Sequence, residues 1–572
     1  MSIFAGILDF EFADSISQSM VRDLAAAMTR NAADKPQLLE GPGYAFAKID
    51  FGILGSDGAY VDDSGIVSLL AGVPLLADTR RGSTRQDELR ILHDAWINDD
   101  ISALQGSRGS FCAAHFDPNS RRLSLVCDKL GLRPIYHTVQ GRYLIFSTAL
   151  RILETISWAE KTIDVSSVAE IASLGYPLGN RSPYANISTV GAGAIVEAGR
   201  AGVRLREYWR WDTLPECEVP QDQLPSHLFG IFRDAVQRRL GDQRAVVACL
   251  SGGLDSRCVV SCLRQLGVAV HALNFGPAGS LDQGLGRLAA DKLGTRYFEL
   301  PEGPFTFWDR MLALHQSWMI ESAASEVEHP RLVWAGDGGS VGLGHVYLTE
   351  EMISQMREGR TIEAVDNLVR HNSWQLPRRL FERRQRERVK DLPRADILEE
   401  ISKLNSFDKG RNVHLFLMLN DQRRHLTQHF EAIDLLRFEV VTPFFDAEFL
   451  RLILTSPIDG FLKHRFYVRW LQEFSPETTA IPWQAYPGHE PCPLPVPKDL
   501  RWQWDAYFGK EERQTISRRM LAGVEKDLND PRFPKWLLDK KMLRLAIWLT
   551  KLGIRDYYYL FKVARTFTRY SQ

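Results

Sequence analysis

AVVACLSGGLDSRCVVSCLRQLG, residues 245–267, decides how the second half of this chain folds. AVVACL is continuously apolar, as in a strand that is buried on both faces. SGGLDS (251–256) follows it, and a helical pattern begins at once. Strand and helix patterns then alternate up to about residue 300. This alternation predicts a parallel sheet covered by helices on both faces, with SGGLDS at the carboxyl edge, where such sheets bind their ligands.

The residue types of SGGLDS suit a magnesium-bound nucleotide. The N-terminus of the following helix offers free N–H groups and a partial positive charge to phosphate. Gly252 and Gly253 let the backbone approach an anion, and Ser251 and Ser256 add hydroxyl donors. Asp255 would repel phosphate unless Mg²⁺ bridges the two. The loop is neither a Walker A nor a GxGxxG motif, and an ordinary glycine-rich turn is the alternative.

Composition narrows the class of protein. The 572 residues are 45% hydrophobic and 25% charged, and the formal net charge is −1. These values predict a globular chain of two domains, with no nucleic-acid partner and no membrane span. The seven cysteines form no CxxC pair, which favours reduced thiols. The first residues lack a basic segment of the kind found in secretory signals, so we expect a cytoplasmic protein.

The chain pattern changes near residue 210. Short strand candidates with two interrupting helices fill the first 150 residues, which predicts a layered α+β domain with much antiparallel sheet. Three prolines lie in 211–226, which we interpret as a linker between domains 1–210 and 227–572. From about residue 350 the chain reads as mostly helical. The basic run 378–390 is interpreted as a solvated helix face, with a phosphate or acidic-peptide contact as the alternative.

SGGLDS after a strand resembles the pyrophosphate loop of the N-type ATP pyrophosphatases, and the chain as a whole resembles the asparagine synthetase family. Five further stretches carry the resemblance in order: DKLGLRPIYH (128–137), GRYLIFSTAL (141–150), EYWRW (207–211), EVVTPFFDAEFL (439–450) and FLKHRFYVRWL (461–471). The resemblance implies an Ntn-hydrolase-like N-terminal sandwich. It also implies an α/β parallel-sheet PP-loop ATP pyrophosphatase domain with a helical C-terminal part.

The resemblance also implies an activity: an ATP-dependent amide-bond synthetase that activates a carboxylate as an acyl-adenylate and releases pyrophosphate and AMP. ATP and Mg²⁺ are the expected cofactors. Lys463 aligns with the family's catalytic lysine, and a fixed cation there suits the charge of adenylation. The residues expected to bind ATP or pyrophosphate are Leu250, Ser251, Gly252, Gly253, Leu254, Asp255, Ser256, Asn274, Phe275, Gly336, Gly338 and Ser340.

The second catalytic loop departs from the family pattern. Its counterpart here is AGDGGSVGLGHV (335–346), in which Asp337 takes the place of a glutamate. Ser340 stands where the family has its pyrophosphate- and Mg²⁺-binding aspartate, and Val341 replaces the next acid. Asp255 and Asp337 are therefore the expected metal ligands, and Asp337 is also a catalytic candidate. Serine ligates Mg²⁺ only as a neutral oxygen, so weak metal binding or lost catalysis is an alternative.

The N-terminus departs further. Ser2 stands where the family has the cysteine nucleophile that splits glutamine, and segments that hold glutamine are replaced. Asp87 is expected to keep the place of the aspartate that pairs with the substrate amine. We therefore expect a glutaminase-like domain that keeps its fold and has lost its activity. A Ser2 nucleophile with its own amine as base is the alternative.

Nitrogen would then come from ammonia or from an amine of the substrate. A chain that uses an amine of its own substrate would resemble β-lactam synthetases and lasso-peptide macrolactam synthetases, which also lack the cysteine. Asparagine formation, amidation of a sugar acid and a nucleotide-binding pseudoenzyme are further alternatives. The expected partner is a small-molecule or peptide carboxylate, with a homodimer as an option.

Four other features have structural interpretations. His425 and His429 are spaced four residues apart near Asp421 but lack an HExxH motif. Cysteines near the nucleotide loop read as small core residues. The proline-rich stretch 486–497 is either a lid or acceptor-pocket segment or a plain loop. The aromatic, basic C-terminus predicts a helical layer, with docking of a peptide, carrier protein or membrane as the alternative.

Overall fold

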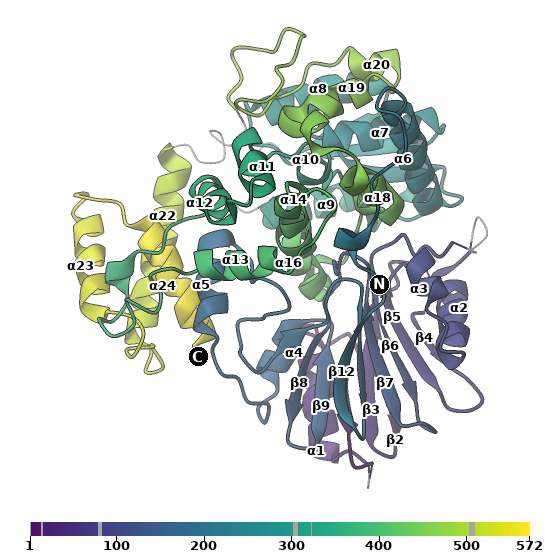
Figure 1. The fold of residues 1–572 in the computed structure, drawn as a ribbon, viewed down its shortest axis with the longest axis vertical. Helices are drawn as coiled ribbons and strands as arrows, with labels where there is room; N and C mark the ends of the chain where they lie inside the picture. The colour runs from purple at the N-terminus through teal and green to yellow at the C-terminus, as the bar shows by residue number, and fades with distance from the viewer. Residues whose placement is uncertain are drawn as a thin grey trace. The chain divides into compact units, whose positions relative to one another are not determined.

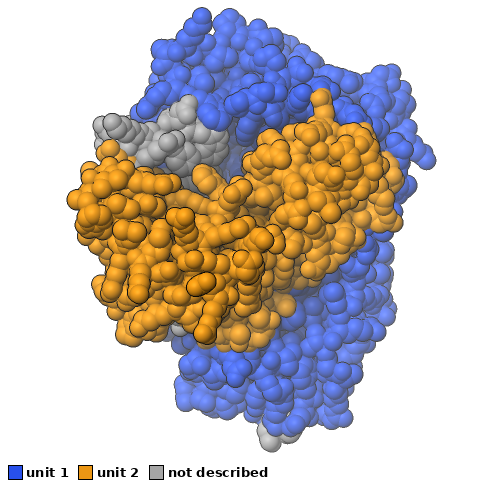
Figure 2. Space-filling view, turned by 60° about the vertical axis from the view of Figure 1, so that its left-hand side comes forward, with its two compact units in different colours: residues 1–160, 189–346, 417–506 blue, residues 161–188, 347–416, 507–572 orange. Residues whose placement is uncertain are grey.

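The computed structural model describes residues 2–12, 15–55, 57–77, 83–300, 307–321, 323–502 and 510–571. Contacts divide the chain into two compact units, coloured separately in Figure 2. The first unit holds residues 1–160, 189–346 and 417–506, and the second holds 161–188, 347–416 and 507–572. Within the described ranges, no helix is both long and apolar enough to cross a membrane.

The N-terminal residues build two six-stranded sheets (Figure 1). The first has the order β10-β8-β9-β1-β3-β2, formed by β1 (Ser2–Asp9), β2 (Gln37–Gly41), β3 (Tyr44–Asp50), β8 (Tyr136–Gln140), β9 (Tyr143–Ser147) and β10 (Ser188–Thr189). The second has the order β12-β11-β7-β6-β5-β4, formed by β4 (Ala59–Val61), β5 (Val67–Gly72), β6 (Phe111–Asp117), β7 (Arg122–Cys127), β11 (Ala194–Gly199) and β12 (Gly202–Glu207). In the first sheet β1 pairs antiparallel with β3 and β9, and all neighbours in the second are antiparallel.

The two sheets pack face to face over an aromatic core. Phe4 and Phe46 of the first sheet and Phe116 of the second belong to one cluster, each at most 1% exposed. Full burial of a side chain of this size contributes about 1.5–3 kcal/mol. Helices cover the outer faces: α1 (Gln18–Ala27) and α4 (Leu150–Thr155) on the first sheet, α2 (Arg85–Ile97) and α3 (Ser102–Gly106) beside the second. The predicted layered α+β sandwich is confirmed.

A five-stranded parallel sheet forms the other part of the first unit, in the order β15-β14-β13-β16-β17. Its strands are β13 (Ala245–Cys249), β14 (Ala269–Asn274), β15 (Arg296–Glu299), β16 (Leu332–Trp334) and β17 (Glu439–Val441). Its helices include α6 (Leu224–Leu240), α7 (Asp255–Gln265), α8 (Leu281–Leu293), α9 (Phe307–Ile320), α18 (Ala447–Thr455), α19 (Arg465–Leu471) and α20 (Pro476–Thr479). The predicted parallel α/β fold around SGGLDS is confirmed.

Shorter helices connect these elements. They are α10 (Gly339–Gly342), α15 (Arg423–His425), α16 (Thr427–Glu431) and α17 (Ile433–Leu436), with a π-helical turn at Met418–Gln422. Single 3-10 turns lie at Trp211–Thr213, Ala323–Glu326, Pro443–Phe445, Ile458–Gly460 and Leu462–His464.

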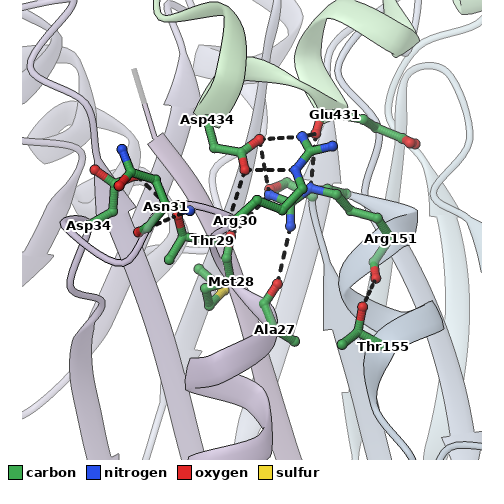
Figure 3. Close-up of polar contacts among 12 residues, drawn as sticks. Ala27, Met28, Thr29, Arg30, Asn31, Asp34, Arg151, Thr155, Glu431 and Asp434 are labelled. Atoms are coloured by element: carbon green, nitrogen blue, oxygen red, sulfur yellow. Dashed lines mark hydrogen bonds and ion pairs between the residues drawn. The ribbon is translucent and has the colours of Figure 1, made fainter.

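Ionic contacts join the sandwich to the parallel-sheet part within the first unit. Figure 3 shows the guanidinium of Arg30 against the carboxylate of Asp434, with Nη2–Oδ1 at 2.5 Å and Nε–Oδ2 at 2.9 Å. Beside it, Arg151 Nε donates to the carbonyl of Glu431 at 3.1 Å. The side chain of Asp434 is fully buried, and burial acts to raise its pKa. The hydrogen bonds and charge of Arg30 nevertheless hold the pKa of Asp434 below the usual value. A bidentate pair of this kind fixes orientation as well as distance.

The second unit is helical. Its helices are α5 (Val165–Leu174), α11 (Glu350–Arg357), α12 (Thr361–Asn372), α13 (Arg394–Ser402), α14 (Arg411–Leu417), α22 (Lys510–Asn529), α23 (Lys540–Lys551) and α24 (Tyr558–Tyr570). Val168 of α5 shares a buried cluster with Phe561 and Phe567 of α24. The predicted helical C-terminal part is therefore present.

The helix predicted for the basic run 378–390 is wrong. The run forms one 3-10 turn, Arg378–Leu380, and then irregular turns. Its backbone pairs with another segment instead: the N–H of Glu382 donates to the carbonyl of Leu537 at 2.9 Å, and the N–H of Asp539 donates to that of Leu380 at 2.8 Å. These tertiary hydrogen bonds replace the ones that a helix would make.

Candidate functional site

SGGLDS joins β13 to α7 and is held by its own polar groups. The N–H of Ser251 donates to the hydroxyl of Ser256 at 2.9 Å, and the N–H of Gly253 donates to the hydroxyl of Ser251 at 3.2 Å. The N–H of Gly252 donates to Oδ1 of Asp282 at 3.0 Å. Three consecutive N–H groups of the loop therefore already have acceptors within the protein.

The two glycines of the loop have different roles. A Cβ on Gly252 would lie 2.6 Å from the carbonyl oxygen of Leu281, so this glycine lets the start of α8 pack against the loop. A Cβ on Gly253 would meet only the hydroxyl of Ser251, at 3.4 Å. Gly253 is therefore the glycine with open space beside it, where an anion could approach the backbone.

Asp282, which the sequence did not single out, supports this loop from α8. It is 5% exposed, and burial raises its pKa to about 6 although the hydrogen bond from Gly252 acts to lower it. Asn274 is the second brace: its Nδ2 donates to the carbonyls of Leu250 at 2.8 Å and Asp282 at 3.0 Å. No local motif marks Asp282, because its partner lies on another element.

Three residues expected at the nucleotide site occupy structural positions. Leu250 and Leu254 are 1% and 7% exposed and belong to the core of the parallel-sheet part. Phe275 follows β14, and its carbonyl accepts a hydrogen bond of 2.7 Å from Nε of Arg310. Of the three, only Leu254 also lines the cavity beside Asp255.

Asp255, the first residue of α7, is the central carboxylate. Its Oδ2 accepts hydrogen bonds from the N–H of Ser340 at 3.0 Å and from the Ser340 hydroxyl at 2.6 Å. Its Oδ1 accepts one from the hydroxyl of Tyr467 at 2.6 Å. Burial raises the pKa of Asp255 to about 6, the hydrogen bonds oppose this, and the charge of Asp337 adds to it. No cation is among the partners that the described residues supply to Asp255.

The glycines of the 335–346 loop let it close over the start of α7. A Cβ on Gly336 would lie 2.4 Å from the backbone nitrogen of Ser256, and one on Gly339 would lie 2.5 Å from Oδ1 of Asp255. Gly338 has a φ of +94°, a left-handed conformation that glycine adopts without strain. Larger residues at these positions would push Ser340 away from Asp255.

Asp337 has a partner that the sequence reading did not pair with it. Its Oδ1 lies 2.7 Å from Nε2 of His425, at the end of α15. Burial acts to lower the pKa of His425, but the Asp337 hydrogen bond and charge raise it above the ordinary value. His429, four residues on, is instead buried against the ring of Phe438 at 5.1 Å. The two histidines therefore act in different environments.

A cavity of about 140 Å³ opens beside Asp255. Among its lining residues are Ser251, Gly253, Asp255, Ser340 and, from the far side, Tyr486 and Glu490. This volume is below the roughly 300–1,000 Å³ of most small-molecule pockets. The cavity thus matches the polar end of a ligand rather than a whole nucleotide.

The proline-rich stretch 486–497 contributes to this cavity through Tyr486 and Glu490. Arg257 of α7 holds the residues before it: its Nη1 donates to the carbonyl of Ile481 at 2.6 Å and its Nη2 to that of Pro482 at 2.8 Å. Arg257 is 0% exposed, so these buried hydrogen bonds join α7 to the residues just before Tyr486 of the cavity wall.

Lys463 and His464 lie at a sharp bend before α19, with φ angles of +57° and +63°. His464 lines the cavity, and its Nδ1 lies 2.8 Å from Nδ1 of His489. Burial and His489 lower the pKa of His464 to about 3, so it is neutral at pH 7. Burial lowers the pKa of His489, and the charge of the half-buried Lys463 lowers it further. Two consecutive left-handed residues without glycine are a strained arrangement of the kind that clusters at functional sites.

Ser2 lies in a closed ionic cluster of the sandwich. Its hydroxyl donates to Oδ2 of Asp50 at 2.5 Å, and Nη1 of Arg85 donates to Ser2 Oγ at 3.3 Å. Burial acts to raise the pKa of Asp50, but the charge of the N-terminal amine, then the Arg85 charge and the Ser2 hydrogen bond, lower it to about 2. Lys48 pairs with Asp57, and burial lowers the pKa of this lysine to about 8.

Asp87 makes its hydrogen bonds at the start of α2 and not within this cluster. It forms a capping box with Thr84: the Asp87 N–H donates to the Thr84 hydroxyl at 3.2 Å, and the Thr84 N–H donates to Asp87 Oδ2 at 2.9 Å. These hydrogen bonds lower the pKa of Asp87. Such a box stabilises a helix start.

Two family models match the chain: "Glutamine amidotransferase domain" over residues 78–209 and "Asparagine synthase" over residues 228–316. The chain is 23% identical over 181 residues to asparagine synthetase [glutamine-hydrolyzing] 3 of Bacillus subtilis, covering 31% of this chain and 29% of that one. It is 28% identical over 180 residues to a putative asparagine synthetase [glutamine-hydrolyzing] 2 of Methanocaldococcus jannaschii, covering 30% and 34%.

The chain therefore spans about a third of the length of these curated relatives. A solved glutamine phosphoribosylpyrophosphate amidotransferase from B. subtilis covers 47% of this chain and 65% of its own, at 9% identity and a TM-score of 0.25, too low to support any conclusion. The two family models follow each other on the chain in the order of the antiparallel sandwich and the parallel sheet. By these matches, the chain is similar to asparagine synthetases over about a third of its length, and two of its segments match the two family models.

Proposed function

We propose that this chain is an ATP-dependent carbon–nitrogen ligase that activates a carboxylate as an acyl-adenylate, releasing pyrophosphate, and transfers it to an amine, releasing AMP. The observation that carries the proposal is Asp255. It is a carboxylate with a raised pKa, placed at the carboxyl edge of a parallel sheet beside a polar cavity. Perturbed acids in such clefts are typical of functional sites.

Pyrophosphate would lie over Ser251 and Gly253, which line the cavity. The hydroxyl of Ser251 and the N-terminus of α7 would bind its oxygens. The donor set fits Mg²⁺ carried by ATP, because Asp255 and Ser340 offer a carboxylate and a hydroxyl oxygen 2.6 Å apart. Mg²⁺ often takes one or two carboxylates together with substrate phosphates. When bound there, it would offset the charge of the departing pyrophosphate.

Asp337 and Lys463 would act from the sides of the cavity. Asp337 is close enough to raise the pKa of Asp255, so its charge would help to attract a cation. We propose it as a second metal ligand that must first leave His425, its partner at 2.7 Å. Lys463 is next to His464, which lines the cavity, but does not line it itself, so its side chain would have to move toward the cavity to neutralise phosphate.

The nitrogen would come from ammonia or from an amine of the substrate rather than from glutamine. Ser2 supports this, because its hydroxyl donates to Asp50, whose pKa of about 2 makes it a poor base. A general base works best when its pKa lies near the operating pH. Glu490 of the cavity wall is a carboxylate that could hold an incoming amine.

A nucleotide-binding pseudoenzyme is the second candidate. The specific observation in its favour is Ser340, whose hydroxyl and N–H satisfy one oxygen of Asp255 where the family carries a second acid. A site stabilised without a cation would bind Mg²⁺ weakly.

The test is nucleotide turnover. The purified chain is incubated with ATP, Mg²⁺, ammonium chloride or glutamine, and L-aspartate or a metabolite extract, and AMP, ADP and pyrophosphate are resolved. We expect AMP and pyrophosphate in equal amounts with ammonium or extract, and a loss of about 100-fold or more in Asp255→Ala. The matched control Asp282→Asn keeps a neutral acceptor for Gly252. Binding of Mg·ATP without AMP under all conditions would favour the pseudoenzyme, and no Mg·ATP binding would rule out both.

A further inference from the structure

Exposed apolar side chains are concentrated in one stretch of the second unit. Of the eighteen large hydrophobic residues that are exposed in the described chain, five fall within residues 536–554. They are Trp536, Leu545, Trp548, Leu552 and Ile554, at 49–64% exposure. Scattered exposed hydrophobics are ordinary, but a contiguous group marks an interaction site.

Three of the five form a stripe on α23. Leu545, Trp548 and Leu552, the C-cap, follow one another at spacings of three and four residues, which places them on one side of the helix. The opposite side of α23 packs into the core of the unit, where Leu543, Ala546 and Ile547 are at most 8% exposed. Figure 1 shows α23 at the outer edge of the unit, with α22 and α24 on its inner side. The stripe is thus not needed for the core.

Basic residues surround the stripe. Residues 535–556 carry six Lys and Arg against two Asp, a net charge of +4 in a chain whose net charge is −1. Lys541, Arg544 and Arg555 are exposed. Lys551 lies 2.5 Å from Glu525 and is partly neutralised.

The basic run 378–390 adds to this charge. It carries seven Lys and Arg against two Glu, and the hydrogen bonds of Glu382 and Leu380 hold it against residues 537–539, directly before α23. Its arginines Arg383, Arg384 and Arg388 are exposed. Together the two segments hold thirteen basic and four acidic side chains, a net charge of +9, so the rest of the chain is acidic.

We propose that this face, the stripe on α23 with its basic surroundings, binds the surface of an anionic membrane. Tryptophan and leucine on a helix with flanking Lys and Arg are typical of helices that lie in the membrane interface. The charge is complementary to anionic headgroups, and each basic residue near such a surface strengthens binding. The apolar side chains would enter the headgroup region, and α23 would lie parallel to the membrane without crossing it.

The test uses the full chain and vesicles floated on a density gradient. Vesicles of phosphatidylcholine alone are compared with vesicles containing about 30% phosphatidylglycerol, at low and high salt. We expect the chain to float with anionic vesicles, and to release at high salt because the attraction is screened. Trp548→Ser with Leu552→Ser should reduce the bound fraction about tenfold or more, as should Lys541→Glu with Arg544→Glu.

Controls separate this face from general stickiness and from misfolding. Ile362→Ser on α12 and Leu205→Ser on β12 remove side chains that are 56% and 53% exposed elsewhere, and both should float as the wild type does. Thermal unfolding of each variant should match the wild type. The proposal is overturned if the chain does not float with anionic vesicles, or if Trp548→Ser with Leu552→Ser floats as well as the wild type. It is also overturned if the wild type is a dimer and this variant is not, because the stripe would then bind a second copy of the chain.

Discussion

The sandwich and the parallel sheet each hold a carboxylate that accepts a hydrogen bond from a serine, and the two differ in charge balance. Asp50 accepts from Ser2 and lies 2.5 Å from the guanidinium of Arg85, and its pKa is about 2. Asp255 accepts from Ser340 and Tyr467, with no cation among its described partners, and its pKa is about 6. The charge of Asp50 is neutralised by the protein itself. The charge of Asp255 would be neutralised by a cation that binds together with a ligand.

This difference in charge balance is the reason that we propose a catalytic role for the Asp255 site and a structural role for the Asp50 site. A carboxylate paired to a buried arginine has little tendency to take a proton or metal, and removing it leaves the arginine as an uncompensated buried charge. A buried carboxylate without a cation destabilises the folded state and thereby favours binding of one.

Replacing each aspartate by asparagine should change stability in opposite directions. Asp50→Asn leaves Arg85 without its partner and should lower the free energy of unfolding by about 3–5 kcal/mol. Asp255→Asn removes a carboxylate whose pKa is raised by about two units, so it should raise that free energy at pH 7 by up to about 3 kcal/mol. Urea unfolding of the two variants measures both. Equal destabilisation by the two changes would contradict the comparison.

The two sites should also respond differently to pH. The folded chain binds a proton on Asp255 up to about pH 6, whereas an unfolded aspartate loses it near 4, so stability falls as pH rises through this window. Mg·ATP affinity should rise about tenfold between pH 5 and 7.5, because the ionised form binds the cation. Titration calorimetry at several pH values checks this. A flat profile would contradict the assignment, and Asp50→Asn, if folded, should keep the wild-type slope.

Ser340→Asp should increase the difference in charge balance between the Asp255 and Asp50 sites, because it adds a second carboxylate beside Asp255. Like charges at this distance raise one pKa further, and each unit costs about 1.4 kcal/mol of stability without metal. Mg²⁺ should restore that loss and bind more tightly than in the wild type. Thermal unfolding with and without Mg²⁺ distinguishes the two effects. Ser340→Ala serves as the control, which loses the hydroxyl without adding charge.

Ser2→Ala should have the smallest effect. It removes one hydrogen bond to Asp50, while Arg85 keeps the carboxylate neutralised, so we expect a loss of about 1 kcal/mol. Formation of AMP should not change. A complete loss of a hydrolytic or transfer activity in this variant would instead make Ser2 a nucleophile.

Several features of the fold could be predicted from the sequence. Alternation of strands and helices after residue 245 is local, because strand and helix patterns depend on neighbouring residues. It predicted the parallel sheet and the place of Asp255. The partners of Asp255 could not be predicted in this way, since Tyr467 lies 212 residues away and donates from α19. The pairing of Asp337 with His425, 88 residues apart, was missed for the same reason.

The sequence by itself determined the two sheet types and the position of the loop SGGLDS, because each depends on neighbouring residues. The tertiary structure alone decided the charge state of the two aspartates, the cavity beside Asp255 and the irregular path of residues 378–390. Burial, cations and hydrogen bonds from distant elements set these properties, and no local pattern contains them.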